Sequence, residues 1–283
     1  MQILKLDGLC KQYPAFRLEN VSFSMEAGTI MGLIGRNGAG KTTTLKSMLH
    51  LVHPDAGTVT ICGLDMDKDE REIRSRIGFV SGGASYYQRK RLRELTDVTK
   101  RFYPGWDDGR YARLVRQFSL DESKRVCELS EGMKVKYQLA AAMSHRAELL
   151  ILDEPTSGLD PVSRDELLDT FRTLCEQEGV SILFSTHITS DLDACADTIT
   201  YIQHGRVAAS TDKKTWTWGY LLLQGSDAAC TPALRAACIG ARSHKGELEA
   251  LLRKEDAALA AGFALPPANL EQIMVHLERE AEA

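Results

Sequence analysis

The segment Gly35-Arg-Asn-Gly-Ala-Gly-Lys-Thr42 is the feature that most limits what this chain can fold into. It follows the apolar run Ile30–Ile34 and precedes a stretch with helical spacing, which predicts a strand, a tight loop and a helix in direct succession. Gly35, Gly38 and Gly40 carry no side chain where the backbone would wrap closely around an anion. The pattern G-x-x-x-x-G-K-[ST] in this setting is typical of loops that hold nucleotide phosphates.

The helix expected from Lys41 onward strengthens this prediction. Its first N–H groups have no partner inside the helix, and the positive end of its dipole faces the loop, so an anion is favoured there. Lys41 supplies a positive charge for the β- and γ-phosphates, and the Thr42 hydroxyl is a ligand for Mg²⁺, which prefers oxygen. A glycine-rich turn that matches by chance is the alternative, and the flanking strand and helix argue against it.

Two acids follow a second apolar run. Leu149–Leu152 ends in Asp153 and Glu154, as expected of a buried parallel strand whose carboxyl end opens on a nucleotide crevice. Because successive strand residues point to opposite faces, the two acids need not compete for one ligand. We assign Asp153 to Mg²⁺, directly or through water, and Glu154 to polarising the attacking water.

A histidine follows a third apolar run, Ser181–Phe184. Taken alone, His187 is more often a solvated or structural histidine than a catalytic one. Its place directly after another buried strand, as for Asp153 and Glu154, favours contact with the γ-phosphate.

Composition and charge exclude several classes of protein. The net charge of −4, from 35 Lys and Arg against 39 Asp and Glu, provides no basic field, so we expect no nucleic-acid partner. Apolar stretches such as Leu221–Leu223 fall far short of the roughly 18 residues that span a bilayer, and no export signal follows Met1. We therefore expect residence in the cytosol. The seven scattered cysteines form no C-x-x-C pair and are predicted to be reduced thiols.

Apolar runs bounded by Gly, Pro or Asp alternate with stretches of helical spacing, which predicts an α/β domain with a mainly parallel sheet. A helical subdomain without strands is expected at about 86–145, and a tight hairpin at His204-Gly205 closes the domain at about residue 210. The expected strands are Val21–Met25, Ile30–Ile34, Thr58–Ile61, Ile77–Val80, Leu149–Leu152 and Ser181–Phe184, and the expected helices are Thr42–Leu51, Asp107–Phe118, Ser130–Met143 and Arg164–Cys175.

Residues 211–283 carry no motif and are predicted to be a C-terminal accessory region. We expect a strand at Tyr220–Leu223 and helices around Glu247–Arg253 and Leu270–Arg279. The alanine-rich composition is compatible with a small packed domain or a helical appendage.

The chain as far as Ala209 resembles the nucleotide-binding subunits of ABC (ATP-binding cassette) transporters. The P-loop Gly35–Thr42, the Walker B segment Leu149–Glu154, a D-loop at Ser157–Asp160 and the histidine His187 occur in the order of that family. Leu129-Ser130-Glu131-Gly132-Met133 resembles the family's signature LSGGQ. The resemblance implies a P-loop NTPase of ABC type, with antiparallel β elements, an inserted helical subdomain and ATP with Mg²⁺ as ligands.

The resemblance also implies that two subunits stack head to tail, so that the signature of one closes over the ATP on the P-loop of the other. Tyr13 falls where the family places an aromatic ring on adenine, although an ordinary edge aromatic is an equal alternative. The implied nucleotide contacts are Tyr13, Gly35, Asn37, Gly38, Gly40, Lys41, Thr42, Thr43, Ser130, Gly132 and Asp160, with Glu154 and His187 as catalytic residues and Thr42 and Asp153 on the metal.

Two departures from the family pattern are present. Gly82 stands where the family usually has a glutamine that touches Mg²⁺, and Glu131 and Met133 replace Gly and Gln of the signature. An acid beside a triphosphate costs affinity unless it points away. These departures predict slow or differently coupled hydrolysis.

The signature form S-x-G-M and the segments Phe102–Asp107 and Leu270–Ile273 resemble bacterial exporter cassettes for antibiotics, antimicrobial peptides or lipids. The expected partners are a membrane permease and a second ABC subunit, in a homodimer or one half of a heterodimer, so that the chain lies at the inner face of the membrane through the permease. The alternatives are a soluble ABC ATPase with a role outside transport and a slow-turnover ATP sensor. The basic cluster Arg89–Arg93 is either a solvated face or a docking contact.

Overall fold

The computed structural model describes residues 1–81 and 87–282. The chain divides into two compact units, Met1–Ser210 and Thr211–Ala283. Over the described ranges, no helix combines the length and apolar character needed to cross a bilayer. All seven cysteines are free thiols, as expected.

A six-stranded sheet with the order β10-β9-β3-β8-β7-β6 forms the centre of the first unit. The pairs from β9 through β3, β8 and β7 to β6 are parallel, and β3, β7 and β8 are buried along their whole length. Strands that are covered on both faces read as continuous apolar runs, which is why the sequence located them well. The strands are β3 (Ile30–Ile34), β6 (Ile77–Ser81), β7 (Leu149–Asp153), β8 (Ser181–Thr186), β9 (Thr198–Gln203) and β10 (Arg206–Asp212).

A second, four-stranded sheet has the order β2-β1-β4-β5 and antiparallel pairing throughout. Its strands are β1 (Gln2–Tyr13), β2 (Phe16–Glu26), β4 (Ala56–Ile61) and β5 (Leu64–Asp65), and helix α1 (Lys41–Met48) leads from β3 toward them. One hydrophobic cluster joins Leu6 of β1, Leu45 of α1 and Leu33 of β3. The two sheets and α1 therefore share one core, which holds the loop between β3 and α1 in place.

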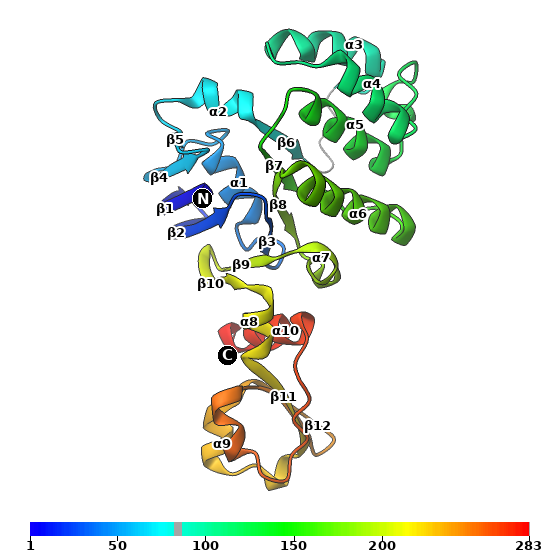
Figure 1. Ribbon diagram of the computed structural model, residues 1–283. Helices are drawn as coiled ribbons and strands as arrows, with labels where there is room; N and C mark the ends of the chain where they lie inside the picture. Colours follow the sequence, from blue (N-terminus) through cyan, green and yellow to red (C-terminus); the bar gives the residue numbers. More distant parts are fainter. Residues whose placement is uncertain (82–86, 283) are drawn as a thin grey trace. The chain divides into compact units, whose positions relative to one another are not determined.

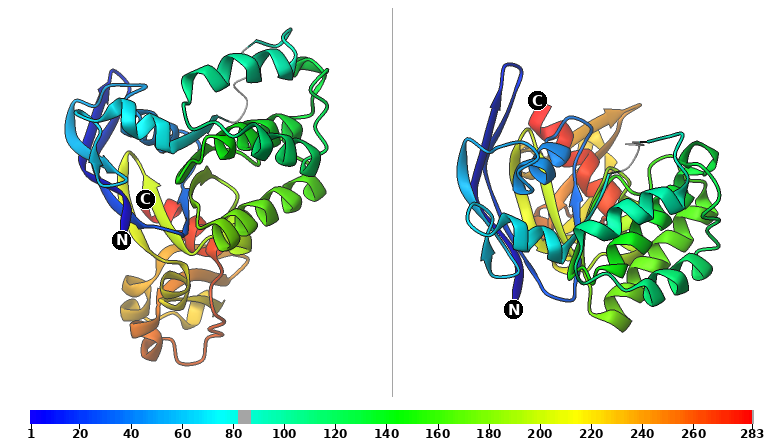
Figure 2. Two further views of the ribbon diagram at one scale, coloured as in Figure 1. Left: turned by 45° about the horizontal axis from the view of Figure 1, so that its top comes forward. Right: turned by 90° about the horizontal axis from the view of Figure 1, so that it is seen from above.

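A group of helices is inserted between β6 and β7: α3 (Leu92–Thr99), α4 (Asp108–Gln117) and α5 (Glu131–Ser144), with one-turn 3₁₀ segments at Lys100–Phe102 and Val126–Glu128. Within the first unit, both views of Figure 2 show this group on the opposite side of the central sheet from β1 and β2. The buried Thr96 hydroxyl lies 2.7 Å from the Tyr111 hydroxyl and 3.1 Å from that of Tyr137, which ties the three helices together.

The remaining helices of the first unit are α2 (Glu70–Arg76), α6 (Pro161–Glu178) and α7 (Thr189–Cys195) (Figure 1). The hairpin expected at His204-Gly205 is present, and both residues have positive φ, 47° and 76°, as a tight primed turn requires. The α/β class with a mainly parallel sheet, antiparallel elements and an inserted helical subdomain is confirmed by the structure.

The second unit contains a three-stranded antiparallel sheet with the order β11-β13-β12. Helix α10 packs on β12 and β13, while α9 and a 3₁₀ segment at Lys254–Leu259 flank the buried cluster around Leu223 and Leu234. The elements are α8 (Lys213–Trp218), β11 (Tyr220–Ser226), a 3₁₀ turn at Asp227–Ala229, α9 (Pro232–Ala237), β12 (Ile239–His244), β13 (Glu247–Arg253) and α10 (Leu270–Glu282).

The helix expected around Glu247–Arg253 was a wrong prediction, because this segment is strand β13. Leu248, Ala250 and Leu252 point into one buried cluster, which is the period of a strand. Glu, Leu, Ala and Arg all favour helices, but pairing with β11 on one side and β12 on the other overrides that preference. The strand and helix expected at Tyr220–Leu223 and Leu270–Arg279 are present.

Candidate functional site

The loop between β3 and α1 has the shape of a phosphate cradle. Gly38 and Gly40 have φ of 83° and 115°, values that a side chain would strain, and Gly40 precedes the first residue of α1. The loop therefore exposes backbone N–H groups at the start of a helix, where an anion is favoured.

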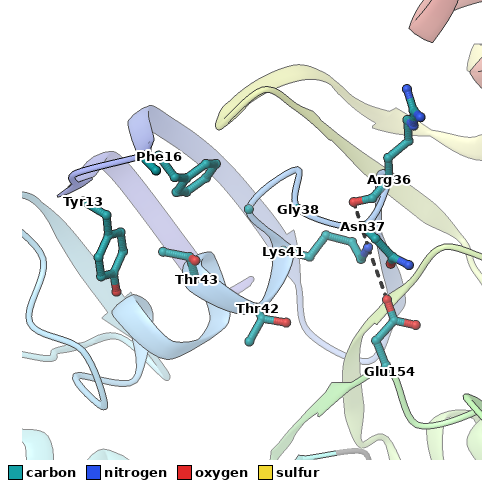
Figure 3. Close-up of a pocket in the computed structure, with 11 residues that line it drawn as sticks. Tyr13, Phe16, Arg36, Asn37, Gly38, Lys41, Thr42, Thr43 and Glu154 are labelled. Carbon is teal, nitrogen blue, oxygen red and sulfur yellow. Dashed lines mark hydrogen bonds and ion pairs between the residues drawn. The ribbon is translucent and has the colours of Figure 1, made fainter.

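The Lys41 ammonium group lies inside this loop, and its side chain is only 5% exposed. Nζ donates to the carbonyl oxygen of Gly35 at 2.7 Å and to that of Arg36 at 3.3 Å. It also lies 3.2 Å from Oε1 of Glu154, which comes from the end of β7. Figure 3 shows the Lys41 side chain directed toward Glu154, with the dashed line marking the ion pair. A phosphate that enters the loop would compete with these oxygens for the lysine.

A pocket of about 570 Å³ surrounds the loop. Tyr13 and Phe16 lie at one end and Glu154 at the other, with the loop between them (Figure 3). Tyr13 and Phe16 are paired residues of the β1–β2 hairpin, which brings both rings to the pocket. Of the expected nucleotide contacts, the pocket is lined by Tyr13, Asn37, Gly38, Gly40, Lys41, Thr42 and Thr43.

Asp153 and Thr42 meet as the metal assignment requires. The Thr42 hydroxyl donates to Asp153 Oδ1 at 3.1 Å, and the Ser185 hydroxyl donates to the same oxygen at 2.7 Å. A hydroxyl and a carboxylate oxygen are ligands that Mg²⁺ prefers, and this cation keeps several waters and binds substrate phosphates as well. No cluster of three or more His, Cys, Asp or Glu suited to a metal occurs among residues 1–81 and 87–282. The donor set fits Mg²⁺ held partly by a triphosphate.

Glu154 and His187 lie in direct contact, with His187 Nδ1 2.9 Å from Glu154 Oε2. Glu154 has a φ of 50°, in the left-handed region that costs a residue with a side chain roughly 1–2 kcal/mol. This conformation turns the chain out of β7, so that the carboxylate reaches both Lys41 and His187. Strained backbone of this kind is concentrated at functional sites.

The residues of the signature and the D-loop lie at the starts of two helices. Ser130 is the N-cap of α5, where its Oγ accepts from the Met133 N–H at 3.2 Å. Asp160 is the N-cap of α6, and hydrogen bonds from Ser163 and Val162 hold the pKa of its carboxyl below the ordinary value. Neither Gly132 nor these two caps line the pocket around Lys41, as described for a single chain. Within one chain, these three residues are therefore not part of the lining of the Lys41 pocket.

The acid within the signature has a local partner. Lys134 Nζ lies 2.6 Å from Glu131 Oε1, one turn further along α5. The ion pair offsets the negative charge that the sequence places at this helix start. Gly82, the other departure from the family pattern, lies outside the described residues.

Two contacts of the site were missed by the sequence analysis. Ser185 lies next to Asp153 because β7 and β8 are parallel neighbours with these two residues in register. The Lys41–Glu154 ion pair depends on the left-handed turn at Glu154. The sequence indicates a role for Ser185 only through its place as a polar residue within the buried run Ser181–Thr186.

The comparisons with known proteins agree with this geometry. The family model described as "ABC transporter" matches residues 18–157. The bacitracin transport ATP-binding protein BcrA of Enterococcus faecalis is 32% identical over 208 residues, which cover 72% of this chain and 68% of that protein. The chain belongs to the ABC transporter ATP-binding family.

Other similar proteins carry related names. The Nod factor export ATP-binding protein I of Burkholderia lata is 37% identical over 197 residues, and the match spans 68% of this chain but only 64% of that protein. A solved ATP-binding subunit of an ABC transporter superposes with a TM-score of 0.67 at 30% identity, over 75% of this chain and 91% of that chain. A dimeric bacterial ABC transporter cassette, 22% identical with a TM-score of 0.66 over 74% of this chain and 98% of its own, shares the fold.

Proposed function

We propose that this chain binds ATP with Mg²⁺, hydrolyses the ATP, and thereby powers a separate membrane permease in a bacterial exporter. The observation that supports the proposal most strongly is the meeting of Lys41, Glu154 and His187 at the phosphate loop, beside Thr42 and Asp153. Sequence similarity to proteins named for Nod factor export and bacitracin transport supports a role in export.

The side chains have separate duties in this proposal. Lys41 and the loop N–H groups bind the phosphates, while Tyr13 stacks on the base. Glu154 orients and polarises the attacking water, and His187 contacts the γ-phosphate and holds the Glu154 carboxylate from the other side. Thr42 and Asp153 hold Mg²⁺, which neutralises phosphate charge. When phosphate replaces Glu154 as the partner of Lys41, the Glu154 carboxylate is released and can accept a hydrogen bond from water.

We also propose that the working form is a dimer, in which the signature of each subunit contacts the ATP bound to the other. Helix α5 begins at Glu131, directly after its N-cap Ser130, and the positive end of the helix would face a γ-phosphate presented by a partner. Through its permease, such a dimer would lie at the inner face of the membrane.

The experiment that tests this function uses Glu154→Gln, which replaces the carboxylate by a neutral amide of similar shape and is expected to slow hydrolysis. Light scattering would give its mass with and without ATP and Mg²⁺, and a phosphate-release assay would compare its turnover with wild type. We expect a shift from one chain to two on adding ATP, because binding to the closed state stabilises it. A chain that binds ATP and stays monomeric would contradict the homodimer, and unchanged turnover would contradict the assignment of Glu154.

A further inference from the structure

Ser185 is a buried serine in the centre of the site, with none of its surface exposed. It belongs to β8 and is the register partner of Asp153 in β7 and of Leu33 in β3. Both neighbouring strands are fully paired with β8 here, so the side chain is held on a rigid part of the sheet.

The Ser185 hydroxyl joins the two carboxylate residues of the site. The backbone N–H of Glu154 donates to Ser185 Oγ at 2.9 Å. Since that oxygen accepts from Glu154, its single proton is free to be donated, and Asp153 Oδ1 receives it at 2.7 Å. One side chain thus fixes the Asp153 carboxylate and the Glu154 backbone at once.

The bond to the Glu154 N–H acts where the backbone is strained. Glu154 has φ of 50°, and in this conformation its carboxylate reaches Lys41 and His187. A non-glycine residue remains in the left-handed region only when its surroundings hold it there. The Glu154 N–H donates to Ser185 Oγ at 2.9 Å, and this bond acts directly on the strained residue.

The neighbouring hydroxyl of Thr186 is engaged in other bonds. Its Oγ1 donates to Asp191 Oδ2 at 3.1 Å and accepts from the Ile188 N–H at 3.0 Å. Asp153, by contrast, also accepts from the Thr42 hydroxyl at 3.1 Å and so has a second hydrogen bond. Loss of the Ser185 hydroxyl should therefore disturb Glu154 more than Asp153.

We propose that Ser185 is a positioning residue for ATP hydrolysis: its hydroxyl holds the Glu154 backbone in the left-handed conformation and aligns Glu154 with Asp153. Ser185 touches neither water nor phosphate in this role and acts through Glu154. The inference rests on the proposed function, because it presumes that Glu154 polarises the attacking water.

The test compares Ser185→Ala with Ser185→Thr, which restores a hydroxyl, in the full chain. Ser181→Ala is the matched control: Ser181 is also buried in β8, and its hydroxyl accepts from the Gly28 N–H at 2.9 Å, at the far end of the strand. Four quantities are measured: kcat for ATP hydrolysis, KM for ATP, the Kd of ATP without metal, and amide hydrogen exchange at Glu154 in the nucleotide-free and metal-free chain. Ser185→Ala is also made in Glu154→Gln.

We expect Ser185→Ala to lower kcat by about tenfold or more, the effect of losing a buried hydrogen bond, with KM and Kd changed less than about twofold. Glu154 amide exchange should rise about tenfold, Ser185→Thr should recover most of both losses, and Ser181→Ala should change neither. In Glu154→Gln, the added Ser185→Ala should cost almost nothing, because residues that act as a unit are not additive.

The proposal would be overturned if Ser185→Ala and Ser181→Ala lowered kcat equally. It would also be overturned if Ser185→Ala lowered kcat by the full tenfold in the Glu154→Gln background, because either result would indicate a purely structural role for Ser185. Unchanged exchange at Glu154 would overturn it as well. A wild-type chain that binds ATP and Mg²⁺ without hydrolysing it would overturn the proposed function itself, and that result is distinct because it appears before any Ser185 variant is made.

Discussion

Lys41 Nζ lies 3.2 Å from Glu154 Oε1, so the cation that should receive phosphate is paired with the carboxylate that should activate water. Lys41 is the first residue of α1, Glu154 directly follows β7, and the Lys41 side chain is almost fully buried. In the proposed function, ATP would displace this carboxylate from the lysine before hydrolysis begins. The proposal therefore predicts that binding of the phosphates and release of Glu154 occur together.

Glu154→Gln should bind ATP more tightly than wild type when metal is absent. A neutral amide competes less well for Lys41 than a carboxylate and does not repel the γ-phosphate, so the Kd should fall roughly twofold to tenfold. Equilibrium binding of a fluorescent ATP analogue measures the change. Glu176→Gln, an exposed acid on α6, is the matched control and should leave the Kd unchanged. Weaker binding in Glu154→Gln would mean that the ion pair does not compete with phosphate.

Tyr13→Ala should weaken binding of ATP but not of tripolyphosphate. Tyr13 lines the end of the pocket away from Glu154, and stacking of a base on an aromatic ring contributes about 1–3 kcal/mol. We expect the Kd of ATP to rise about fivefold or more, while Tyr13→Phe retains the wild-type value. Equal losses for ATP and tripolyphosphate, measured by calorimetry, would instead identify Tyr13 as an ordinary edge aromatic that shapes the loop.

Lys134→Ala should weaken ATP-driven dimerisation, because it uncovers the charge of Glu131 beside the γ-phosphate of the partner. The pair is partly exposed, so the effect should be at most about fivefold and should fade at high salt. Light scattering of Lys134→Ala in the Glu154→Gln background, at several ATP concentrations, would measure the change in dimerisation. Adding Glu131→Gln to Lys134→Ala should restore closure. A dimer that is indifferent to both changes would place Glu131 away from the nucleotide.

The sequence predicted β3, β7 and β8 because each is buried along its whole length and therefore forms a continuous apolar run. Leu149–Leu152 before Asp153 and Ile30–Ile34 before Gly35 are of this kind. The loop, Lys41 and the two acids followed directly from those strand ends. Strand β1 was missed, since its mixture of polar and apolar residues at Gln2–Tyr13 belongs to a sheet with one exposed face.

What the sequence could not provide are the relationships that depend on register and backbone conformation. Ser185 meets Asp153 only because β7 and β8 pair without offset, and Glu154 reaches Lys41 only through a positive φ. Neither is visible in a linear pattern. In the second unit, the helix-favouring residues Glu247–Arg253 form a strand because two neighbours pair with it, and local preference cannot report such pairing.

His145 should make stability depend on pH. Its ring stacks on Tyr103 with centroids 3.8 Å apart, and burial holds its pKa below the ordinary value of about 6.5, against a hydrogen bond with Ser75 that acts in the other direction. The unfolded chain then binds the proton more readily than the folded chain. The stabilisation is fully present above about pH 6.5 and is lost as the pH falls through the folded-state pKa.

His145→Phe keeps the stacking but cannot titrate. Its free energy of unfolding should therefore fall less than that of wild type between about pH 7.5 and about pH 5. These two values lie about one unit or more on either side of the ordinary histidine pKa. Urea denaturation at several pH values measures both. The exposed His244 provides the control, since His244→Phe should follow the wild-type pH profile. Parallel profiles for wild type and His145→Phe would mean that His145 is not held in its neutral form.

Leu252→Ala should destabilise the second unit without changing nucleotide binding. Leu252 is completely buried in β13, opposite Leu221 of β11, and shares a cluster with Leu248 and Ala250. Removing a buried leucine side chain typically costs about 2–5 kcal/mol. Urea denaturation followed by fluorescence reports on this unit through Trp216 and Trp218, and the Kd of ATP should remain at its wild-type value.

The pattern of substitutions also distinguishes the strand from the helix that local preference favours. In a strand, Ala250→Asp places a charge in the same buried cluster as Leu252 and should be severely destabilising. In a helix, position 250 would lie on a different face from positions 248 and 252, and the charge would be tolerated. Leu259→Ala, at an exposed leucine, is the control and should cost little. A tolerated aspartate at position 250 would contradict the strand.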